Sequence, residues 1–397
     1  MFSQFFTKPI FSDLLVNEIS ILEPRSVLEL GVGDGAILNS VKKRWSKAEY
    51  TGLEIDPLLI EKVNSCNLGY NIINKDCSSL NLDIDFIDKK SFFDVGVCNP
   101  PFHEVDNNDS IRSLLEEVNL RYLIDKKSLT LDVVFLLQNL LFLKEGGELG
   151  IVVPDGIATN IGYRKLRAFL LENFTIRKVV QLPSNGFKKT AVQTHIMILE
   201  KGFPKNDFAP LFISDCSGLL TNRIDVNLEF LERRMDYSFH FWRINSRNRM
   251  RKGLKLKDLN PSITRGKFSK RELISKSIPF IHTNNISESG SLILMNNKDY
   301  GNFNSELFND NSLVRQGDVL ITRVGKKCVG RSVLNPLESA LISDCIIRVR
   351  LESKDDRVLL INSLNSSFGR GWLKANSHGT CARSISMKDL LEFPLLE

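Results

Sequence analysis

The sequence predicts an α/β chain, in which a doubly wound, mostly parallel sheet is followed by a smaller β-rich α+β domain. Over residues 1–200, short apolar runs alternate with helical patterns, as in βαβ units whose strands are covered on both faces. A glycine-rich turn follows the first apolar run, where a ligand-binding turn is common in such folds. After Gly202 the alternation stops, and basic residues and short β-like runs replace it.

The first domain is predicted from apolar runs of strand length and the helical segments between them. The run at 26–30 (SVLEL) leads into the glycine turn and then into a helix that ends near Trp45. Further strands are expected over 50–55, 70–74, 93–98, 150–153, 176–182 and 194–199. Further helices are expected from Pro57 and over 129–143 and 163–172. We expect the last two strands to form an antiparallel hairpin at the edge of the sheet.

Length and charge indicate two domains with different properties. The chain has 397 residues and a net charge of +6, and this length suggests two domains. Residues 1–230 hold 25 Lys and Arg against 30 Asp and Glu, whereas residues 231–397 hold 28 against 17. We therefore expect a first domain over 1–230 and a second over 231–397. A basic domain is a candidate nucleic-acid surface, although for any single Lys or Arg a solvated surface is the alternative.

Several features predict a cytoplasmic protein without a metal site or a membrane span. The seven cysteines have no CxxC spacing, and the five histidines lack the spacing of metal ligands. The N-terminus lacks a charged-then-apolar signal pattern. The apolar run at 133–143 is too short to cross a bilayer and contains Gln138 and Asn139.

Glycines and acids follow three consecutive strands. Residues 28–35 (LELGVGDG) carry Gly31 and Gly33, which let the backbone turn tightly and approach a ligand. Glu54 ends the second strand, 23 positions after Gly31, where an acid can accept both hydroxyls of a ribose. Asp76 follows the third strand. Together these residues predict one nucleoside pocket, although each acid alone could be a helix N-cap or a solvated turn.

The tetrad Asn99-Pro100-Pro101-Phe102 follows the fourth strand. Its two prolines stiffen the backbone and remove two N–H donors, so carbonyl oxygens can accept hydrogen bonds beside the Asn99 amide oxygen. Two acceptors on the hydrogens of an aromatic amino group would favour a pyramidal nitrogen, whose lone pair could attack an electrophilic methyl group. Phe102 could stack on the planar ring. A plain proline turn is the alternative.

With these motifs, residues 5–200 resemble a γ-class S-adenosylmethionine-dependent DNA adenine-N6 methyltransferase. The resemblance implies a Rossmann-like methyltransferase sheet, S-adenosyl-L-methionine as cofactor, S-adenosyl-L-homocysteine as product, and no metal. It also implies site-specific methyl transfer to adenine N6 in double-stranded DNA, with the target base flipped out of the helix. Such an enzyme would be the modification enzyme of a restriction-modification system.

The resemblance also implies a cofactor site, residue by residue. The matching positions are Thr7, Pro9, Glu29, Gly31, Gly33, Glu54, Ile55, Asp76, Cys77 and Asn99. By analogy, Glu29 belongs to the motif that holds the methionine end, Glu54 binds the ribose, and Asp76 accepts from the adenine amino group. The N-terminal segment departs from the family pattern, because Lys8 stands between Thr and Pro.

In the same family, the catalytic residues match Asn99, Pro100, Pro101 and Phe102, with Phe102 in place of the commoner Tyr. The C-terminal half resembles one copy of the repeated unit in type I restriction specificity subunits, at 278–286, 317–325, 343–344 and 379–390. This resemblance implies a target-recognition domain. We expect DNA contacts from an aromatic residue and from basic side chains: Phe187, Lys188, Lys189, Arg265, Arg323, Lys326, Lys327 and Arg331.

Three other functions stay open from the sequence. The same tetrad could serve an amino-group methyltransferase that acts on RNA or on a protein glutamine side chain. The chain could instead be a catalytically inactive DNA-binding specificity protein. Cytosine-N4 methylation is a lesser option, because those enzymes more often have Ser or Asp before the prolines. A chain with one catalytic and one recognition domain could act as a monomer, and a cognate restriction endonuclease would act separately.

Overall fold

The computed structural model describes most of the chain, and its contacts divide the chain into two units. The described residues are 8–65, 70–83, 86, 88–106, 108–124, 129–183, 193–246, 253–294, 300, 312–325, 328–379 and 382–396. Unit 1 is Met1–His240 and unit 2 is Phe241–Glu397. Each unit is described by itself below.

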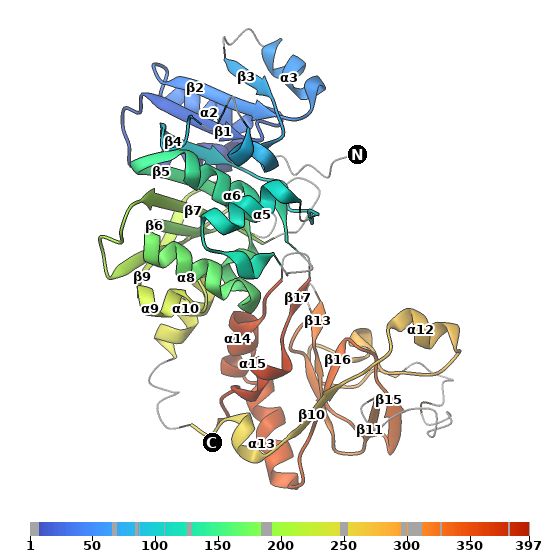
Figure 1. The fold of residues 1–397 in the computed structure, drawn as a ribbon. Coiled ribbons are helices and arrows are strands. Elements are labelled where there is room, and N and C mark those ends of the chain that lie inside the picture. Colours follow the sequence, from blue (N-terminus) through green and yellow to red (C-terminus); the bar gives the residue numbers. More distant parts are fainter. Residues whose placement is uncertain are drawn as a thin grey trace. The chain divides into compact units, whose positions relative to one another are not determined.

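Unit 1 is built on a nine-stranded sheet with the strand order β3-β2-β1-β4-β5-β7-β6-β8-β9 (Figure 1). The strands β1 to β5 pair in parallel, as do β6 and β8, whereas β7 is antiparallel to both of its neighbours. The bounds are β1 (Ser26–Leu30), β2 (Glu49–Glu54), β3 (Asn71–Asn74), β4 (Phe93–Cys98), β5 (Leu143–Pro154), β6 (Phe174–Gln181), β7 (Thr194–Lys201), β8 (Phe208–Ser214) and β9 (Leu220–Asn227). The predicted parallel sheet is confirmed.

Helices pack on both faces of this sheet, and each face has its own apolar core. One core joins the sheet to α5, α6 and α8, and the other joins it to α1 and α2. Consecutive residues of β1 point to opposite cores, with Leu28 in the first and Val27 in the second, so the strand is apolar throughout. The helices of unit 1 are α1 (Pro9–Asn17), α2 (Ala36–Arg44), α3 (Pro57–Asn64), α5 (Asp109–Glu117), α6 (Leu131–Phe142), α7 (Asp155–Thr159), α8 (Arg164–Asn173), α9 (Leu228–Leu231) and α10 (Tyr237–Asn245), with 3-10 turns η1 (Cys77–Leu82), η2 (Arg121–Leu123) and η3 (Ile161–Tyr163).

The antiparallel hairpin of β6 and β7 forms as predicted, but it does not lie at the edge of the sheet. β8 pairs with β6, and β9 pairs with β8, so these two strands extend the sheet beyond the hairpin. The sequence of β9 (LTNRIDVN) has no apolar run, and most of its side chains are exposed or half-buried. Pro210 interrupts β8. β9 is the edge strand and lacks the apolar pattern of a central strand, whereas Pro210 of β8 lies just before the residues that pair with β6.

Unit 2 is smaller and mixes short strands with helices. Its four-stranded antiparallel sheet has the order β10-β16-β12-β14, and two small ribbons pair β11 with β15 and β13 with β17. The bounds are β10 (Ser262–Arg265), β11 (Leu313–Arg315), β12 (Val319–Thr322), β13 (Val324–Gly325), β14 (Ser332–Leu334), β15 (Ser339–Leu341), β16 (Ile346–Arg350), β17 (Arg383–Ser384), η4 (Leu256–Leu259), α12 (Lys270–Ser275), η5 (Thr283–Asn285), α13 (Lys354–Asn365), α14 (Ser367–Asn376) and α15 (Met387–Leu391). In the part of the chain that the structure describes, no helix is long and apolar enough to cross a membrane.

Candidate active site

A cavity of about 250 Å³ lies where β1, β2 and β4 of unit 1 end. Parallel strands end at the same edge of a sheet, so the segments that follow them meet there. The cavity wall includes most of the predicted site residues: Glu29, Gly31, Gly33, Glu54, Ile55, Asp76, Cys77, Asn99, Pro100 and Pro101. Among the described residues, no group of three His, Cys, Asp or Glu side chains is arranged to hold a metal ion.

Glu54 fastens the glycine turn to the end of β2. Its Oε2 accepts the Gly33 N–H at 2.9 Å, and its Oε1 accepts the N–H groups of Ile55 and Asp56 at 2.9 and 3.0 Å. Gly33 has a φ of 58°, in the left-handed region that favours glycine. A carboxylate has about four acceptor sites, so Glu54 keeps capacity for a ligand in the cavity that it lines.

Asp76 both caps a helical turn and lines the cavity. Its Oδ1 accepts the Ser78 N–H at 2.8 Å at the start of η1, so Asp76 is an N-cap on the cavity wall, and its contact with a nucleoside stays a prediction. Its neighbour Cys77 is buried, and burial raises the pKa of its thiol well above the usual range. This cysteine is therefore a neutral wall residue. Ile55 is about half exposed and lies at the rim.

Glu29 lines the cavity although its side chain is only 1% exposed. The Tyr50 hydroxyl donates a hydrogen bond to Glu29 Oε2 at 2.5 Å. Burial raises the pKa of Glu29 to about 8, the Tyr50 hydrogen bond opposes this rise, and the nearby carboxylates of Asp34 and Glu54 add to it. Glu29 is therefore largely protonated at neutral pH.

The tetrad after β4 divides between the cavity and the core. Asn99, Pro100 and Pro101 lie on the cavity wall. Phe102 is half-buried and packs against the apolar core between the sheet and α1 and α2. His103 lies on the wall again. Stacking of Phe102 on a target base stays a prediction.

Some wall residues escaped the sequence prediction. His103 follows the tetrad directly, so its position was a usable signal. Its Nδ1 is buried without a hydrogen-bond partner among the described residues. Leu131 and Phe135 come from α6, whose apolar pattern predicts only core packing. A Cβ on Gly31 would lie 3.3 Å from Phe135 Cε1, so the glycine turn and α6 approach closely.

Other predicted site residues lie away from this wall or outside the described residues. Pro9 begins α1 and borders a separate shallow hollow with Ala36, Asn39, Ser40, Lys42 and Lys43. The residues Thr7, Phe187, Lys188, Lys189, Lys326 and Lys327 lie outside the described part of the chain. Their roles stay predictions.

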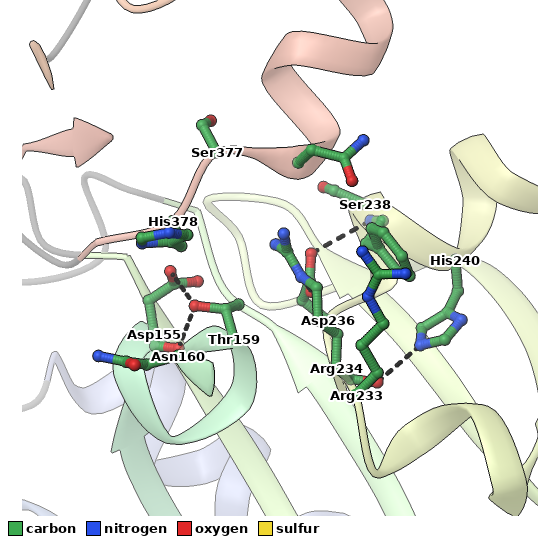
Figure 2. A network of polar contacts seen from close by, with 12 residues as sticks. Asp155, Thr159, Asn160, Arg233, Arg234, Asp236, Ser238, His240, Ser377 and His378 are labelled. Carbon is green, nitrogen blue, oxygen red and sulfur yellow. Dashed lines mark hydrogen bonds and ion pairs between the residues drawn. The ribbon is translucent and has the colours of Figure 1, made fainter. Parts of the chain in front are cut away.

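A buried polar network joins α7, which directly follows β5, to the start of β7. Asp155 follows β5, and its Oδ1 lies 3.0 Å from Nε2 of His195 in β7. Thr159 Oγ1 donates to the other Asp155 oxygen at 2.9 Å (Figure 2). The Asp155 N–H also donates to the Gln193 carbonyl oxygen at 3.0 Å. The start of α7 and the start of β7 are thereby held together.

Three predicted DNA-contact residues are described in unit 2. Arg265 ends β10 and is exposed, whereas Arg323 lies between β12 and β13 and is half-buried. Arg323 Nε donates to the Asp344 carbonyl oxygen at 3.0 Å. Burial and the positive charge of Arg265 lower the pKa of Arg323. Two arginines that repel each other in this way are suited to an anionic ligand. Arg331 is half-buried, and its Nη1 lies 3.5 Å from the Ile286 carbonyl oxygen.

Two curated relatives match parts of this chain. A type I restriction enzyme MpnII methylase subunit from Mycoplasma pneumoniae is 28% identical over 240 residues, which are 54% of this chain and 42% of that protein. A ribosomal RNA large subunit methyltransferase F from Pectobacterium carotovorum is 33% identical over 100 residues, which are 23% of this chain and 32% of that protein. The chain thus spans less than half the length of either relative.

A crystal structure of a modification subunit of a putative type I restriction enzyme from Vibrio vulnificus is also similar. It is 20% identical, with a TM-score of 0.44, over 53% of this chain and 47% of that one. The model of the N-6 DNA Methylase family matches residues 2–244. This match includes the whole cavity wall and more than half of the sequence, and the chain therefore belongs to the N-6 DNA methylase family.

Proposed function

We propose that this chain is a site-specific DNA methyltransferase that transfers a methyl group from S-adenosyl-L-methionine to N6 of adenine in duplex DNA. The observation that carries the proposal is the shared cavity, because Asn99 and the two prolines line the same wall as Glu54 and Asp76. The acceptors for an amino group and the acids for a nucleoside are thus adjacent. The proposed role is that of the modification enzyme in a restriction-modification system.

The cavity residues fit an adenosine cofactor with a cationic end. Glu54 is fixed by three backbone N–H groups and would accept the ribose hydroxyls. Ile55 and Asp76 would lie at the adenine, and Glu29 at the methionine end. When bound, S-adenosyl-L-methionine supplies an electrophilic methyl group on a sulfonium.

The tetrad would prepare the amino nitrogen that receives the methyl group. The Asn99 amide oxygen and a proline carbonyl oxygen would each accept one amino hydrogen, which leaves the nitrogen lone pair free to attack. The attack would form the N6–methyl bond as the sulfur–methyl bond breaks, and one amino proton would then pass to solvent. The adenine must first leave the duplex, at a cost of a few kcal/mol, and Phe102 would stack on it.

The decisive experiment is expression in a host without DNA methylation, followed by genome-wide mapping of modified adenines. N6-methyladenine at one short sequence motif is the expected result, and it would also identify the recognition sequence. An unmodified genome, together with no methyl transfer to duplex DNA by the purified protein, would contradict the proposal.

Replacement of Glu54 by alanine tests the cofactor site. The change removes the acceptor of three backbone N–H groups and of the ribose, and hydrogen bonds to a charged group contribute about 1.5–3 kcal/mol each. We expect the Kd of S-adenosyl-L-methionine to rise at least about 10-fold, measured by isothermal titration calorimetry. Asp56→Ala is the matched control, because Asp56 caps α3 but does not line the cavity. Equal losses in the two variants would count against a ribose contact.

We also propose that Arg265 and Arg323 contact DNA phosphates. If so, Arg265→Gln and Arg323→Gln should each weaken DNA binding similarly across sequences, and each should make the slope of log K against log salt shallower by about one. Fluorescence anisotropy at several salt concentrations measures this slope. Lys354→Gln, at the exposed start of α13, is the control. A wild-type slope in both arginine variants would remove them from the interface.

A second candidate is an amino-group methyltransferase that acts on RNA. The observation that favours it is the 33% identity to the ribosomal RNA methyltransferase over 100 residues. Methyl incorporation into duplex DNA, ribosomal RNA and protein, measured side by side, separates the two functions. The similarity to the RNA methyltransferase extends over 100 residues and does not explain the basic unit 2. A basic second unit favours duplex DNA as the substrate.

The partners are also a matter for experiment. We propose that the chain acts as a monomer, since the chain carries both a catalytic unit and a second, basic unit. Any cognate endonuclease would act separately. The name of the Mycoplasma relative describes a methylase subunit, which makes assembly with other subunits the competing possibility. Light scattering of the purified chain with and without duplex DNA distinguishes the two.

A further inference from the structure

We propose that Tyr50 positions the carboxyl group of Glu29, and that this pair receives the α-ammonium group of the cofactor with release of one proton to solvent. Tyr50 does not line the cavity, so it would act through Glu29 as a positioning residue. This inference deepens the proposed function, because it rests on S-adenosyl-L-methionine as the cofactor.

The geometry of the first two strands makes this contact possible. Glu29 in β1 lies opposite Gly52 in β2, and Tyr50 precedes Gly52 by two residues on the same face. A Cβ on Gly52 would lie 2.8 and 2.9 Å from the Cε1 and Oη atoms of Tyr50. The absence of a side chain at Gly52 therefore lets the tyrosine ring lie across β2 and reach the Glu29 carboxyl group.

Among the described residues, the titratable groups that act on Glu29 include no basic side chain. The titratable groups that act on it are Tyr50 from β2, Asp34 from the glycine turn, Glu54 from the end of β2, and Cys98 from β4. Tyr70 packs edge-on against Tyr50, with the ring centroids 5.3 Å apart. All of these groups are acids, so an ionised Glu29 would be a buried charge without a counter-ion, which is unfavourable. A cation at the cavity wall would supply the missing charge.

The sign of the pH effect follows from this arrangement. Burial raises the pKa of Glu29 to about 8 in the free protein, so below pH 8 the group carries a proton that a bound ammonium would displace. Cofactor affinity should therefore increase with pH, by up to about tenfold per pH unit, over the range below about pH 8. Titration calorimetry in two buffers of different ionisation enthalpy measures the released proton directly.

Two substitutions test whether the released proton comes from Glu29 or from another group. Glu29→Gln keeps the shape but cannot ionise, so its affinity should be low and nearly independent of pH. Tyr50→Phe removes the hydrogen bond that opposes the raised pKa, so its affinity should fall several-fold at pH 6.5 relative to the wild type. The ligand's own amino group titrates near pH 8, so the comparison is made from pH 5.5 to 7, with Glu29→Gln as baseline.

The ligand series identifies the cationic partner. S-adenosyl-L-methionine and S-adenosyl-L-homocysteine both carry the α-ammonium group and should both release the proton, whereas adenosine should not. Adenosine binding also reports whether each variant keeps a folded cavity. Tyr122→Phe, a half-buried tyrosine away from the cavity wall, should keep the wild-type profile.

The outcomes distinguish this inference from the proposed function. Wild-type binding of S-adenosyl-L-methionine with the same pH dependence as Glu29→Gln would overturn the Glu29–Tyr50 pair and leave the proposed function intact. Proton release with adenosine would overturn it equally. If the wild type bound neither S-adenosyl-L-methionine nor adenosine, the proposed function itself would fail. If Tyr50→Phe no longer binds adenosine, its cavity is not intact. The pH dependence of cofactor binding in the wild type and in Glu29→Gln then tests the inference.

Discussion

Replacement of Asn99 by alanine is expected to slow methyl transfer to duplex DNA by about 10²- to 10³-fold, at saturating cofactor and DNA. This is the size of effect seen when one fixed polar group that acts on the reacting atoms is removed from an active site. Asn99 lies on the cavity wall directly after β4, where the stiff Pro100–Pro101 pair fixes its backbone. Single-turnover methyl incorporation measures the chemical step without product release.

Two further variants make this prediction specific. Asn99→Asp keeps an acceptor oxygen and should recover part of the lost rate. If Asn99 had only a structural role, the rate of Asn99→Asp would not exceed that of Asn99→Ala. Asn173→Ala, at the exposed end of α8 where the side chain bonds only to the Phe169 carbonyl oxygen, should retain the wild-type rate. Wild-type methylation by Asn99→Ala would refute the proposed mechanism.

Replacement of Arg167 by methionine is expected to lower the free energy of unfolding of the chain by about 3–5 kcal/mol, because each buried carbonyl oxygen left without a donor costs about 1–3 kcal/mol. Arg167 lies in α8 and is 0% exposed. Its guanidinium donates to the carbonyl oxygens of Ile157 and Asn160 after β5, at 2.7 and 3.0 Å, and of Glu232 and Arg233 after β9, at 2.9 and 2.7 Å. Methionine would fill the volume and leave these oxygens without donors.

Arg164→Met provides the matched control on the same helix. Arg164 bonds to the Glu232 carboxylate at 2.9 Å, but both side chains are exposed, and such pairs contribute about 0–1 kcal/mol. Urea denaturation followed by fluorescence compares the two variants. Equal midpoints for Arg164→Met and Arg167→Met would contradict the structural role assigned to Arg167.

The sequence predicts the catalytic half of the fold well because strong local signals coincide with burial. The strands that end at Leu30, Glu54 and Cys98 are buried along nearly their whole length, and the motif residues lie at or directly after the end of each strand. Topology then brings these motifs to one edge. Phe135 shows the limit, because a helix residue that touches the glycine turn has the same pattern as one that only fills the core.

Unit 2 is less predictable, since its strands are short and their pairing is non-local. The β-like runs at 318–324 and 342–351 contain β12, the first residue of β13, and β16, whereas Ile281 makes an isolated bridge with Ile342. The helices α13 and α14 were not predicted. Polar residues dominate their sequences, and their apolar side chains, such as Leu360 and Trp372, become part of a core only through packing against the sheet.

The three backbone hydrogen bonds to Glu54 have a consequence for the energetics of recognition. They hold the glycine turn in its bent form within the protein's own framework, through Gly33 and the first residues after β2. A ligand that enters such a preorganised site does not have to order a loop, so little conformational entropy is lost on binding. The cofactor should therefore bind to a nearly rigid site. Most of the conformational entropy lost before methyl transfer would then be that of the flipped base.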